Sequence, residues 1–589
     1  MTSYHVTLDG QGLILDLGTY RKQVAPPFAD KVAQGDRTYQ DLFFEQVWQL
    51  GDWSGGDGVI GYLHWDAGRP DRYRSGSDVD GYSQPGSLQV GPDLVSSGAP
   101  ANNGYTVLQP FKGKLYAGTT DGKIYEWNGA SWALSRDTAK AGGIRAMAVY
   151  KGKLYAGNGT DGVVDSFDGT TWTAAAFTVT GVSGVRSMAV FDVTSPTLYV
   201  GASIATGAGL YRYNGSTVSA VLYNAQEPDV YAMVVYGGYL WFLGADASSR
   251  RGSVYRTDTT SFDRRLDLPE NYVTAAIVHQ GLVFLGMGAG GELWSFDGTA
   301  QAVVAKDLTA SGDELRGLAV WQRALWVSTR NGGEIRLKRY EAGSGAWSEP
   351  AAGGSVNSSS GGAQGMATLG ADLYVAGQKS GTAAPIYKVS SGVYPTAAKT
   401  LESGLFSANL GSDNKVFRSV TLNHAALVSG QSVQVQYRLE DSGSWTTLGT
   451  SATVGATSAT FSFAAGAVGK LIALRLVLTA TAAATPVLYE VLVRYAPAPA
   501  TKREWRFEAL FEGSADLPLI TLDGQADPKT GPQIAAAVWA SKAKSGPLTY
   551  VDLDGTTYSA WLLELREGVT ERSQRRGYST RGVVRLLEA

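Results

Sequence analysis

The sequence predicts a mainly β protein: a seven-bladed β-propeller, then a β-sandwich, then a small α+β domain. A short motif recurs about every forty residues between positions 104 and 397. Apolar and polar residues alternate around each copy, and turn dipeptides separate the runs, which indicates short antiparallel strands. Glycine is abundant (74 residues), aromatic residues reach 11% and charged residues only 17%, a composition typical of turn-rich β proteins.

The repeated motif is clearest at Lys114–Gly118 and Lys153–Gly157, which both read Lys-Leu-Tyr-Ala-Gly. Looser copies share an apolar residue followed by an aromatic one, and they lie at Leu198-Tyr199, Leu240-Trp241, Val283-Phe284, Leu325-Trp326 and Leu373-Tyr374. A strand rich in small residues precedes the motif, and a strand ending in an aromatic residue and an Asn-Gly or Asp-Gly turn often follow. Four strands per repeat and seven repeats predict a propeller over residues 96–397. Leucine-rich and helical repeats are disfavoured, because they need a different period or 3.6-residue patterning and the sequence shows neither.

Residues 1–95 contain few long periodic segments. A hairpin around Asp9-Gly10 is expected near the start, and aromatic residues lie in polar, glycine-rich sequence farther on. We expect an extended N-terminal arm that packs on another part of the assembly. Asp78-Val79-Asp80-Gly81 superficially resembles a calcium loop, but the remaining oxygen ligands and the Glu at the twelfth position are missing, so a plain turn is expected.

Residues 398–497 contain several short period-2 strands, which predict a β-sandwich of the jelly-roll or carbohydrate-binding-module shape. Trp445 in this region is equally compatible with a buried core position and with an exposed ring on which a sugar stacks. After a proline-containing linker, residues 502–589 begin with an alternating aromatic strand. Pro532 opens a helix in which Ile534 and Val538 share a face, and a hairpin turns at Asp554-Gly555. These elements predict a small α+β domain with one sheet and one helix.

Composition limits the partners and the chemistry. The formal net charge of −3 gives no electrostatic argument for nucleic acid or for an anionic membrane. The absence of cysteine excludes disulfides, thiolate catalysis and cysteine-ligated metals. Residues 1–6 show neither the basic nor the apolar region of a signal peptide, and no apolar run is long enough to span a bilayer. We therefore expect synthesis in the cytoplasm without a signal peptide, and no membrane insertion.

The aromatic opening strand, the helix and the hairpin at 548–558 resemble the β-barrel-plus-helix domain of phage tail tube and distal tail proteins. The N-terminal arm, with Phe28-Ala29-Asp30-Lys31 and Asp52-Trp53-Ser54-Gly55-Gly56, looks like the start of long phage tail components. The resemblance implies a structural protein of a virion tail or baseplate. Its partners would be copies of itself and other tail proteins, and its propeller would be available for attachment to a host-surface glycan.

Motifs for catalysis are weak, although propellers host sialidases, glycosidases and lyases. The stretch from Ser166 to Trp172 approaches a sialidase Asp-box, yet no residue separates Asp168 from Gly169, so a hairpin turn is the better interpretation. His5, His64, His279 and His424 fall in separate segments without metal-ligand or triad spacing. We predict no enzymatic activity, no metal and no cofactor. A propeller lectin outside any virion remains the alternative, followed by a propeller glycosidase or lyase.

A column of mostly polar residues provides the candidate binding site. Aligning the inner strands of the repeats gives Thr106, Arg145, Arg186, Tyr231, Thr274, Arg316 and Gln364. Inner strands start at the face that carries the loops between second and third strands, so these residues are expected to surround one channel mouth. Arginine binds carboxylates and phosphates through paired hydrogen bonds, which would suit an acidic sugar. Alternatively, the column only lines a wet channel and hydrogen-bonds neighbouring strands.

Overall fold

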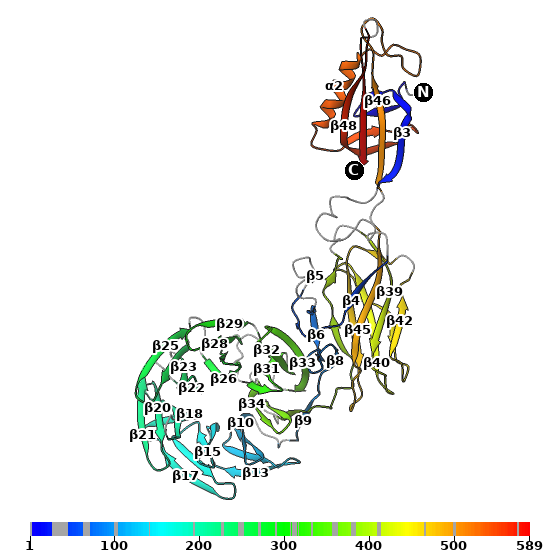
Figure 1. The fold of residues 1–589 in the computed structure, drawn as a ribbon. Coiled ribbons are helices and arrows are strands. Elements are labelled where there is room, and N and C mark those ends of the chain that lie inside the picture. Colours follow the sequence, from blue (N-terminus) through cyan, green and yellow to red (C-terminus); the bar gives the residue numbers. More distant parts are fainter. Residues whose placement is uncertain are drawn as a thin grey trace. The chain divides into compact units, whose positions relative to one another are not determined.

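The computed structural model describes residues 3–25, 45–59, 61–62, 71–98, 100, 104–140, 142–191, 195–205, 207–224, 229–245, 252–268, 273–288, 291–306, 308, 315, 317–331, 334–355, 363–377, 385–408, 414–464, 467–498, 502–573 and 577–589. The chain divides into two compact units. One comprises residues 1–46, 410–417 and 495–589, and the other comprises residues 47–409 and 418–494. Both units consist mainly of β-strands (Figure 1). No helix within the described ranges is long and apolar enough to cross a membrane.

Within the described residues, the larger unit contains seven sheets of four antiparallel strands, numbered here in chain order. Sheet 1 contains β10 (Tyr105–Phe111), β11 (Lys114–Thr119), β12 (Lys123–Trp127) and β13 (Trp132–Asp137). Sheet 2 contains β14 (Ile144–Tyr150), β15 (Lys153–Asn158), β16 (Val163–Phe167) and β17 (Trp172–Thr178). Sheet 3 contains β18 (Val182–Phe191), β19 (Thr197–Ile204), β20 (Gly207–Tyr213) and β21 (Val218–Asn224).

Sheet 4 contains β22 (Val230–Tyr236), β23 (Tyr239–Ala245), β24 (Gly252–Thr257) and β25 (Phe262–Leu268). Sheet 5 contains β26 (Val273–His279), β27 (Leu282–Met287), β28 (Leu293–Phe296) and β29 (Gln301–Ala305). Sheet 6 contains β30 (Gly317–Trp321), β31 (Ala324–Asn331), β32 (Glu334–Glu341) and β33 (Ala346–Ser355). Sheet 7 contains β34 (Ala363–Leu369), β35 (Asp372–Gly377) and β36 (Ile386–Val389). Its fourth strand is β9 (Leu94–Ser96), which precedes sheet 1 in the chain.

The repeated motif explains these sheets. Its aromatic residue is buried in the second strand of every sheet, at Tyr116, Tyr155, Tyr199, Trp241, Phe284, Trp326 and Tyr374. Turns such as Lys112-Gly113 and Lys151-Gly152 place both residues at positive φ, as tight hairpins between twisted strands require. Seven hydrophobic clusters within the described residues each join one sheet to the next, and the last joins sheet 7 back to sheet 1. The sheets therefore form a closed, propeller-like ring.

The ring closes through β9, the strand contributed from the N-terminal region. Val389 pairs with Leu94, and Tyr387 pairs with Ser96. The neighbouring sheet reinforces this closure, because the indole Nε1 of Trp132 in sheet 1 donates to Ser97 Oγ at 2.9 Å. Three residues of extended chain thus complete the last sheet, which leaves no unpaired third strand at the seam.

The strands after the ring form two further sheets. The first contains β37 (Lys399–Glu402), β38 (Leu405–Phe406), β40 (Ser432–Leu439), β41 (Thr446–Ser451) and β44 (Ile472–Thr479), with β5 (Gly61–Tyr62) and β6 (Ser75–Ser77) from the N-terminal region. The second contains β39 (Lys415–His424), β42 (Ser458–Ser462), β43 (Val468–Gly469) and β45 (Leu488–Pro497), with β4 (Gln46–Leu50). Alternate residues such as Val433 and Val435 are buried, as the period-2 pattern predicts.

A seven-stranded sheet forms the smaller unit, which we call the terminal domain. Its order is β2 (Gln11–Leu13), β1 (Val6–Leu8), β47 (Leu548–Val551), β48 (Thr557–Ser573), β49 (Gly577–Glu588), β46 (Lys502–Phe511) and β3 (Leu15–Ala25). The one described helix, α2 (Gly531–Lys542), buries Ile534, Ala535 and Val538. It begins after Thr530, whose N–H donates to Gln533 Oε1 at 2.9 Å, and it ends at Lys542.

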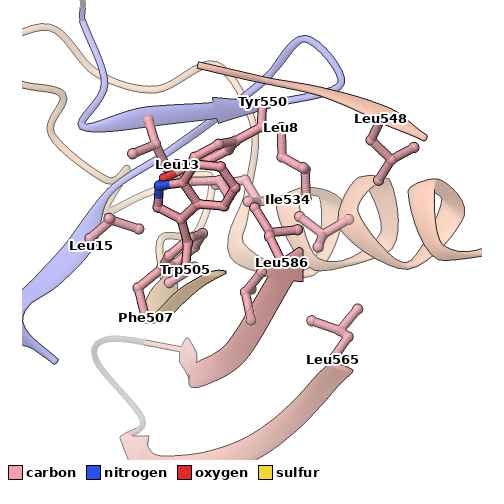
Figure 2. Close-up of a cluster of buried hydrophobic side chains, with 14 of the residues drawn as sticks. Leu8, Leu13, Leu15, Trp505, Phe507, Ile534, Leu548, Tyr550, Leu565 and Leu586 are labelled. Atoms are coloured by element: carbon pink, nitrogen blue, oxygen red, sulfur yellow. The ribbon is translucent and has the colours of Figure 1, made fainter. Parts of the chain in front are cut away.

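Side chains from both ends of the sequence share the core of the terminal domain (Figure 2). Leu8, Leu13 and Leu15 pack with Trp505, Phe507 and Leu586. Asp552 fastens β3 to this core, because it accepts hydrogen bonds from Tyr20 Oη at 2.5 Å, Lys22 Nζ at 2.6 Å and Trp505 Nε1 at 3.1 Å. Burial acts to raise the pKa of Asp552, but these donors outweigh it and lower the pKa below its usual value.

The expected N-terminal arm over residues 1–95 needs correction. The hairpin around Asp9-Gly10 is present, with Val6 opposite Leu13, but Thr7 also pairs with Val551 and Leu15 with Ala509. The described part of this region contributes strands to the terminal-domain sheet, to both sheets after the ring and to sheet 7, rather than forming a separate arm. Its apolar residues obtain their buried environment from segments several hundred positions away, which explains why they lacked local periodic patterning. Residues 26–44, which include part of the arm, lie outside the described residues.

Candidate functional site

The predicted channel-rim residues occupy equivalent positions in the ring. Thr106, Arg145, Arg186, Tyr231 and Thr274 each lie at a β-bulge near the start of the first strand of their sheet. The backbone of Gln364 falls within a similar irregularity in β34, between Ala363 and Met366. Arg316 lies outside the described residues. A bulge leaves one residue without a cross-strand partner and can redirect its side chain, so the sequence column corresponds to a structural one.

Several rim side chains bond to protein groups. Thr106 Oγ1 donates to the carbonyl of Gly118 at 3.1 Å and to that of Ile144 in the next sheet. Thr274 repeats this pattern, with Gly286 O at 3.1 Å and Leu315 O at 2.8 Å. These hydroxyl groups tie neighbouring sheets together, as the alternative interpretation of the column predicts.

The one rim arginine whose partners are fully defined is paired with acid. Arg186 Nε lies 2.8 Å from Asp229 Oδ1 and 2.8 Å from Ser203 Oγ, and its Nη1 lies 3.4 Å from the Gly159 carbonyl. An anionic ligand would therefore have to compete with the Asp229 carboxylate. Anion binding at the rim stays a prediction.

A second region, missed by the sequence analysis, contains a cavity of about 590 Å³ at the opposite ends of the strands. Sheet 6 provides Trp321, Trp326, Arg339 and Glu341, and nearby turns provide Gln280, Gln322, Arg323, Ser391 and Gly392. The remaining wall comes from Tyr394 and from the N-terminal segment with Asp80, Tyr82, Ser83, Pro85, Gln89, Val90 and Pro92. This volume and mixture of aromatic and charged groups are typical of small-molecule sites.

The N-terminal wall is part of residues 71–92, which we call the strap. The strap contains β7 (Val79–Asp80) paired with β8 (Gln89–Val90), and it crosses the outer strand of sheet 6. The Asp78 N–H donates to the Glu349 carbonyl at 2.9 Å. Gly91 lies so close to β33 that a Cβ there would be 1.7 Å from the Pro350 carbonyl oxygen. The strap is therefore fixed against sheet 6 by backbone contacts.

Asp80 shapes the turn of the strap. Its Oδ1 accepts hydrogen bonds from the N–H groups of Tyr82 at 2.8 Å and Ser83 at 2.9 Å. Asp78, the other acid of the supposed calcium loop, forms an ion pair with Lys399. Both carboxylates thus act as turn or ion-pair partners. The plain turn predicted for Asp78-Val79-Asp80-Gly81 needs correction, because Val79–Asp80 forms strand β7 and the turn lies at residues 80–83.

Arg339 is the central charged residue of the cavity wall. Its side chain is only 4% exposed, and its guanidinium Cζ lies 4.0 Å from the centroid of the Tyr82 ring. Nη2 lies 3.2 Å from Glu341 Oε1, whereas Nη1 is 3.6 Å from Asp80 Oδ1, beyond hydrogen-bond distance. Among the described residues, Nε and Nη1 have no hydrogen-bond partner.

Glu341 replaces a turn-forming residue that recurs in the ring. At the equivalent position, directly after the third strand, sheets 1 to 5 have Asn128, Asp168, Asn214, Asp258 and Asp297. Each of these side chains accepts hydrogen bonds from the backbone N–H groups two and three residues ahead. The hairpin interpretation of the stretch around Asp168 is therefore confirmed, and the hydrogen bonds from Thr171 and Thr170 lower the pKa of Asp168 to about 2.

Glu341 instead turns toward the strap. Burial, followed by a hydrogen bond from the phenol to Glu341, raises the pKa of Tyr82 to about 12. The same carboxylate contacts Arg339, so half-buried Tyr82 and the buried Glu341 and Arg339 form one polar group beside the cavity. The substitution of Glu for Asn or Asp at this repeat position was a signal in the sequence that pointed to sheet 6.

Other candidate residues are dispersed. His5 lies directly before β1, His279 lies in β26 and His424 in β39, and His64 is outside the described residues. No cluster of acids and histidines suited to a metal occurs within the described ranges. The Trp445 ring is in contact with Arg438 and Arg475, whose guanidinium carbons are 4.6 and 4.4 Å from its centroid. Two cations from β40 and β44 thus hold Trp445 beside the first sheet after the ring.

Comparison with known proteins gives limited information. The chain matches no protein family, and it matches no curated protein sequence. Among solved structures, it is similar to the computationally designed protein Ika8, with 15% identity over 50% of this chain and 99% of that one and a TM-score of 0.35. It is also similar to YCF48 from Cyanidioschyzon merolae, with 11% identity over 50% and 98% and a TM-score of 0.38. YCF48 bound to D1 peptide gives 9% identity over 51% and 96% and a TM-score of 0.37.

Proposed function

We propose that this chain is a structural and attachment protein of a phage tail or baseplate. In this proposal the terminal domain joins the assembly, and the closed ring, a seven-bladed β-propeller, is presented for contact with a host-surface glycan. The chain needs no enzymatic activity, metal or cofactor for this role. Its direct partners are copies of itself and other tail proteins.

The observation that carries the proposal is that both ends of the sequence build one domain. Strands β1 to β3 and β46 to β49 share a sheet and a core, so the ring and sandwich are a large insertion between β3 and β46. An insertion of this kind leaves the ring outside the fold of the terminal domain. That arrangement suits a protein in which one part is held by an assembly and another is displayed.

The surface of the terminal domain supports the same role. Large apolar side chains are at least two-fifths exposed at Leu17, Leu517, Ile520, Leu522, Trp539, Leu553, Trp561 and Leu563. Most comparably exposed apolar residues elsewhere among the described residues are valines. Exposed leucine, isoleucine and tryptophan side chains favour burial against another protein.

The test is incorporation into particles. A full-length tagged chain, expressed together with the genes of its source particle, should copurify with tail proteins at fixed stoichiometry. A Leu517→Ser/Leu522→Ser variant should fold normally and lose incorporation, whereas the matched exposed substitution Val303→Ser in the ring should not. A monodisperse chain that joins no particle would refute the assembly role and would favour the free-standing propeller lectin.

A further inference from the structure

We infer that the cavity beside sheet 6 is a binding site for an uncharged saccharide. This inference names the ligand class for the proposed attachment role, on which it rests for its biological setting. The site differs from the predicted rim, because it lies at the other ends of the strands and depends on the strap.

The first argument is the comparison among the sheets. The third-strand residue opposite the buried aromatic is Glu126, Ser166, Arg212, Arg256, Ser295, Arg339 and Lys388 in sheets 1 to 7. Glu126 and Lys388 bond to neighbouring lysine and aspartate side chains on their own sheets, and Arg212 is exposed. Only at Arg339 does the strap cover the position, within the part of the chain that is described. Ser166 is buried and Arg256 is 19% exposed without the strap, so burial alone does not distinguish Arg339. What distinguishes it is that the strap covers it and a cavity lies beside it.

The second argument is the unmet hydrogen-bonding capacity of Arg339. Its Nε and Nη1 are buried and have no acceptor among the described residues, although the side chain is 96% enclosed by protein. Buried donors without acceptors are costly and uncommon in native proteins. Because both atoms are also closed off from water, a ligand oxygen in the adjacent cavity would become their acceptor after a small movement of Tyr82, whose ring covers the guanidinium.

The charged residues of the cavity wall favour an uncharged ligand oxygen over the oxygen of a carboxylate or phosphate. Asp80 and Glu341 oppose Arg323 and Arg339, so the charged lining residues balance. A carboxylate or phosphate bound near Arg339 would also lie near the two acids, which repel it. A cation bound near the acids would be repelled by the arginines in the same way. A hydroxyl group can accept a hydrogen bond from a guanidinium and donate one to a carboxylate at the same place. An uncharged polyol satisfies both kinds of group.

The aromatic residues supply the apolar part of the site. Trp321 Nε1 donates to Ala371 O at 2.9 Å, and Trp326 Nε1 donates to Trp321 O at 3.0 Å. Both indole N–H groups are occupied and the residues are only 5% and 1% exposed, so these rings offer a small, apolar surface to the cavity. Tyr82 and Tyr394 complete the aromatic lining. The C–H faces of a pyranose ring fit aromatic walls, while its hydroxyl groups reach Arg339 and Glu341.

The experiment uses the full chain. An array should carry neutral oligosaccharides of glucose, galactose, mannose and N-acetylglucosamine, together with matched uronic-acid and sialic-acid members. We expect binding to a neutral member, followed by calorimetry with that sugar. Arg339→Gln removes the guanidinium and its charge, and Ser391→Trp places a bulky side chain at an exposed residue of the cavity wall. Each should raise the Kd at least ~10-fold, about 1.4 kcal/mol. Ser131→Trp, an exposed hairpin residue of sheet 1, is the matched control and should leave the Kd unchanged.

Ser391→Trp keeps the test decisive if Arg339→Gln fails to fold, which thermal unfolding will show. Binding confined to acidic members, no binding to any member, or a Ser391→Trp variant that binds like the parent would each overturn the inference. A chain that enters particles but binds no neutral sugar contradicts this inference and leaves the assembly role intact. A chain that binds sugar but enters no particle contradicts only the assembly role.

Discussion

Sheets 2 and 6 share one strand plan but differ at a single hairpin position. In sheet 2, Asp168 is exposed and accepts hydrogen bonds from Thr170 and Thr171 within its own turn. In sheet 6, Glu341 is buried and contacts Arg339, a residue on the same strand that the strap covers. The glutamate side chain is one methylene longer, so it no longer suits the local Asx turn. The comparison teaches that one repeat can replace the usual turn residue where a segment from another part of the chain covers that position.

The largest expected effect comes from breaking the buried group in sheet 6. Arg339→Leu leaves Glu341 buried without its cation and should lower the free energy of unfolding by about 3–5 kcal/mol. The equivalent substitution Arg212→Leu in sheet 3 is exposed and should change it by less than about 0.5 kcal/mol. Urea unfolding followed by tryptophan fluorescence measures both. Equal effects at the two positions would show that the strap does not bury a charge pair.

Glu341→Asp restores the residue type of sheets 2, 4 and 5. The shorter side chain should withdraw from Arg339 and Tyr82, and the loss of a hydrogen bond to a charged group should cost about 1.5–3 kcal/mol. The same urea experiment applies. A stabilised variant would mean that the Asx turn matters more than the contact with Arg339.

Tyr82→Phe keeps the ring against Arg339 and removes the hydroxyl that bonds to Glu341. We expect a loss of about 1 kcal/mol in stability. In a Glu341→Gln background the same substitution should cost less, because its charged acceptor is gone. A double-mutant cycle with equal costs in the two backgrounds would contradict the hydrogen bond.

The smallest effect is expected in sheet 2. Asp168→Asn keeps the oxygen that accepts the turn hydrogen bonds, as Asn128 and Asn214 do in sheets 1 and 3, so stability near pH 7 should not change. The pKa of Asp168 is lowered to about 2 from an unfolded value of about 3.9. A lowered pKa gives stability that is present above the unfolded value and lost as the pH falls toward 2. The variant should therefore show a shallower acid loss of stability between pH 4 and pH 2 than the parent. Parallel curves would contradict the turn assignment.

Much of the ring could be predicted from the sequence because its information is local. The period, the buried aromatic of the second strand and the turn dipeptides all act within about forty residues. The rim column was also predictable, since one bulge recurs near the start of the first strand. The partners of its side chains were not, because Asp229 belongs to the following repeat and carries no pattern of its own.

The N-terminal region escaped prediction for the opposite reason. β9 has only three residues, and its identity as a strand depends on its pairing with β36. β3 obtains its partners from β46, and its core position from Trp505 and Phe507. A strand stabilised by such distant contacts leaves little trace in its own composition. The cavity combines both difficulties, because the strap supplies one wall and sheet 6 the other.

The sheet shared by the chain ends also sets an order in time during synthesis. Ser97 meets Ile386 across 289 residues, and Ser3 meets Asp523 across 520. Sheets made of neighbouring strands can form as they leave the ribosome, but ring closure waits for sheet 7, and the terminal domain waits for β46 to β49. A chain interrupted after the ring therefore has a displayed part and no completed terminal domain. If that domain joins the assembly, then only full-length chains can be incorporated, and truncated chains are excluded before a particle is built.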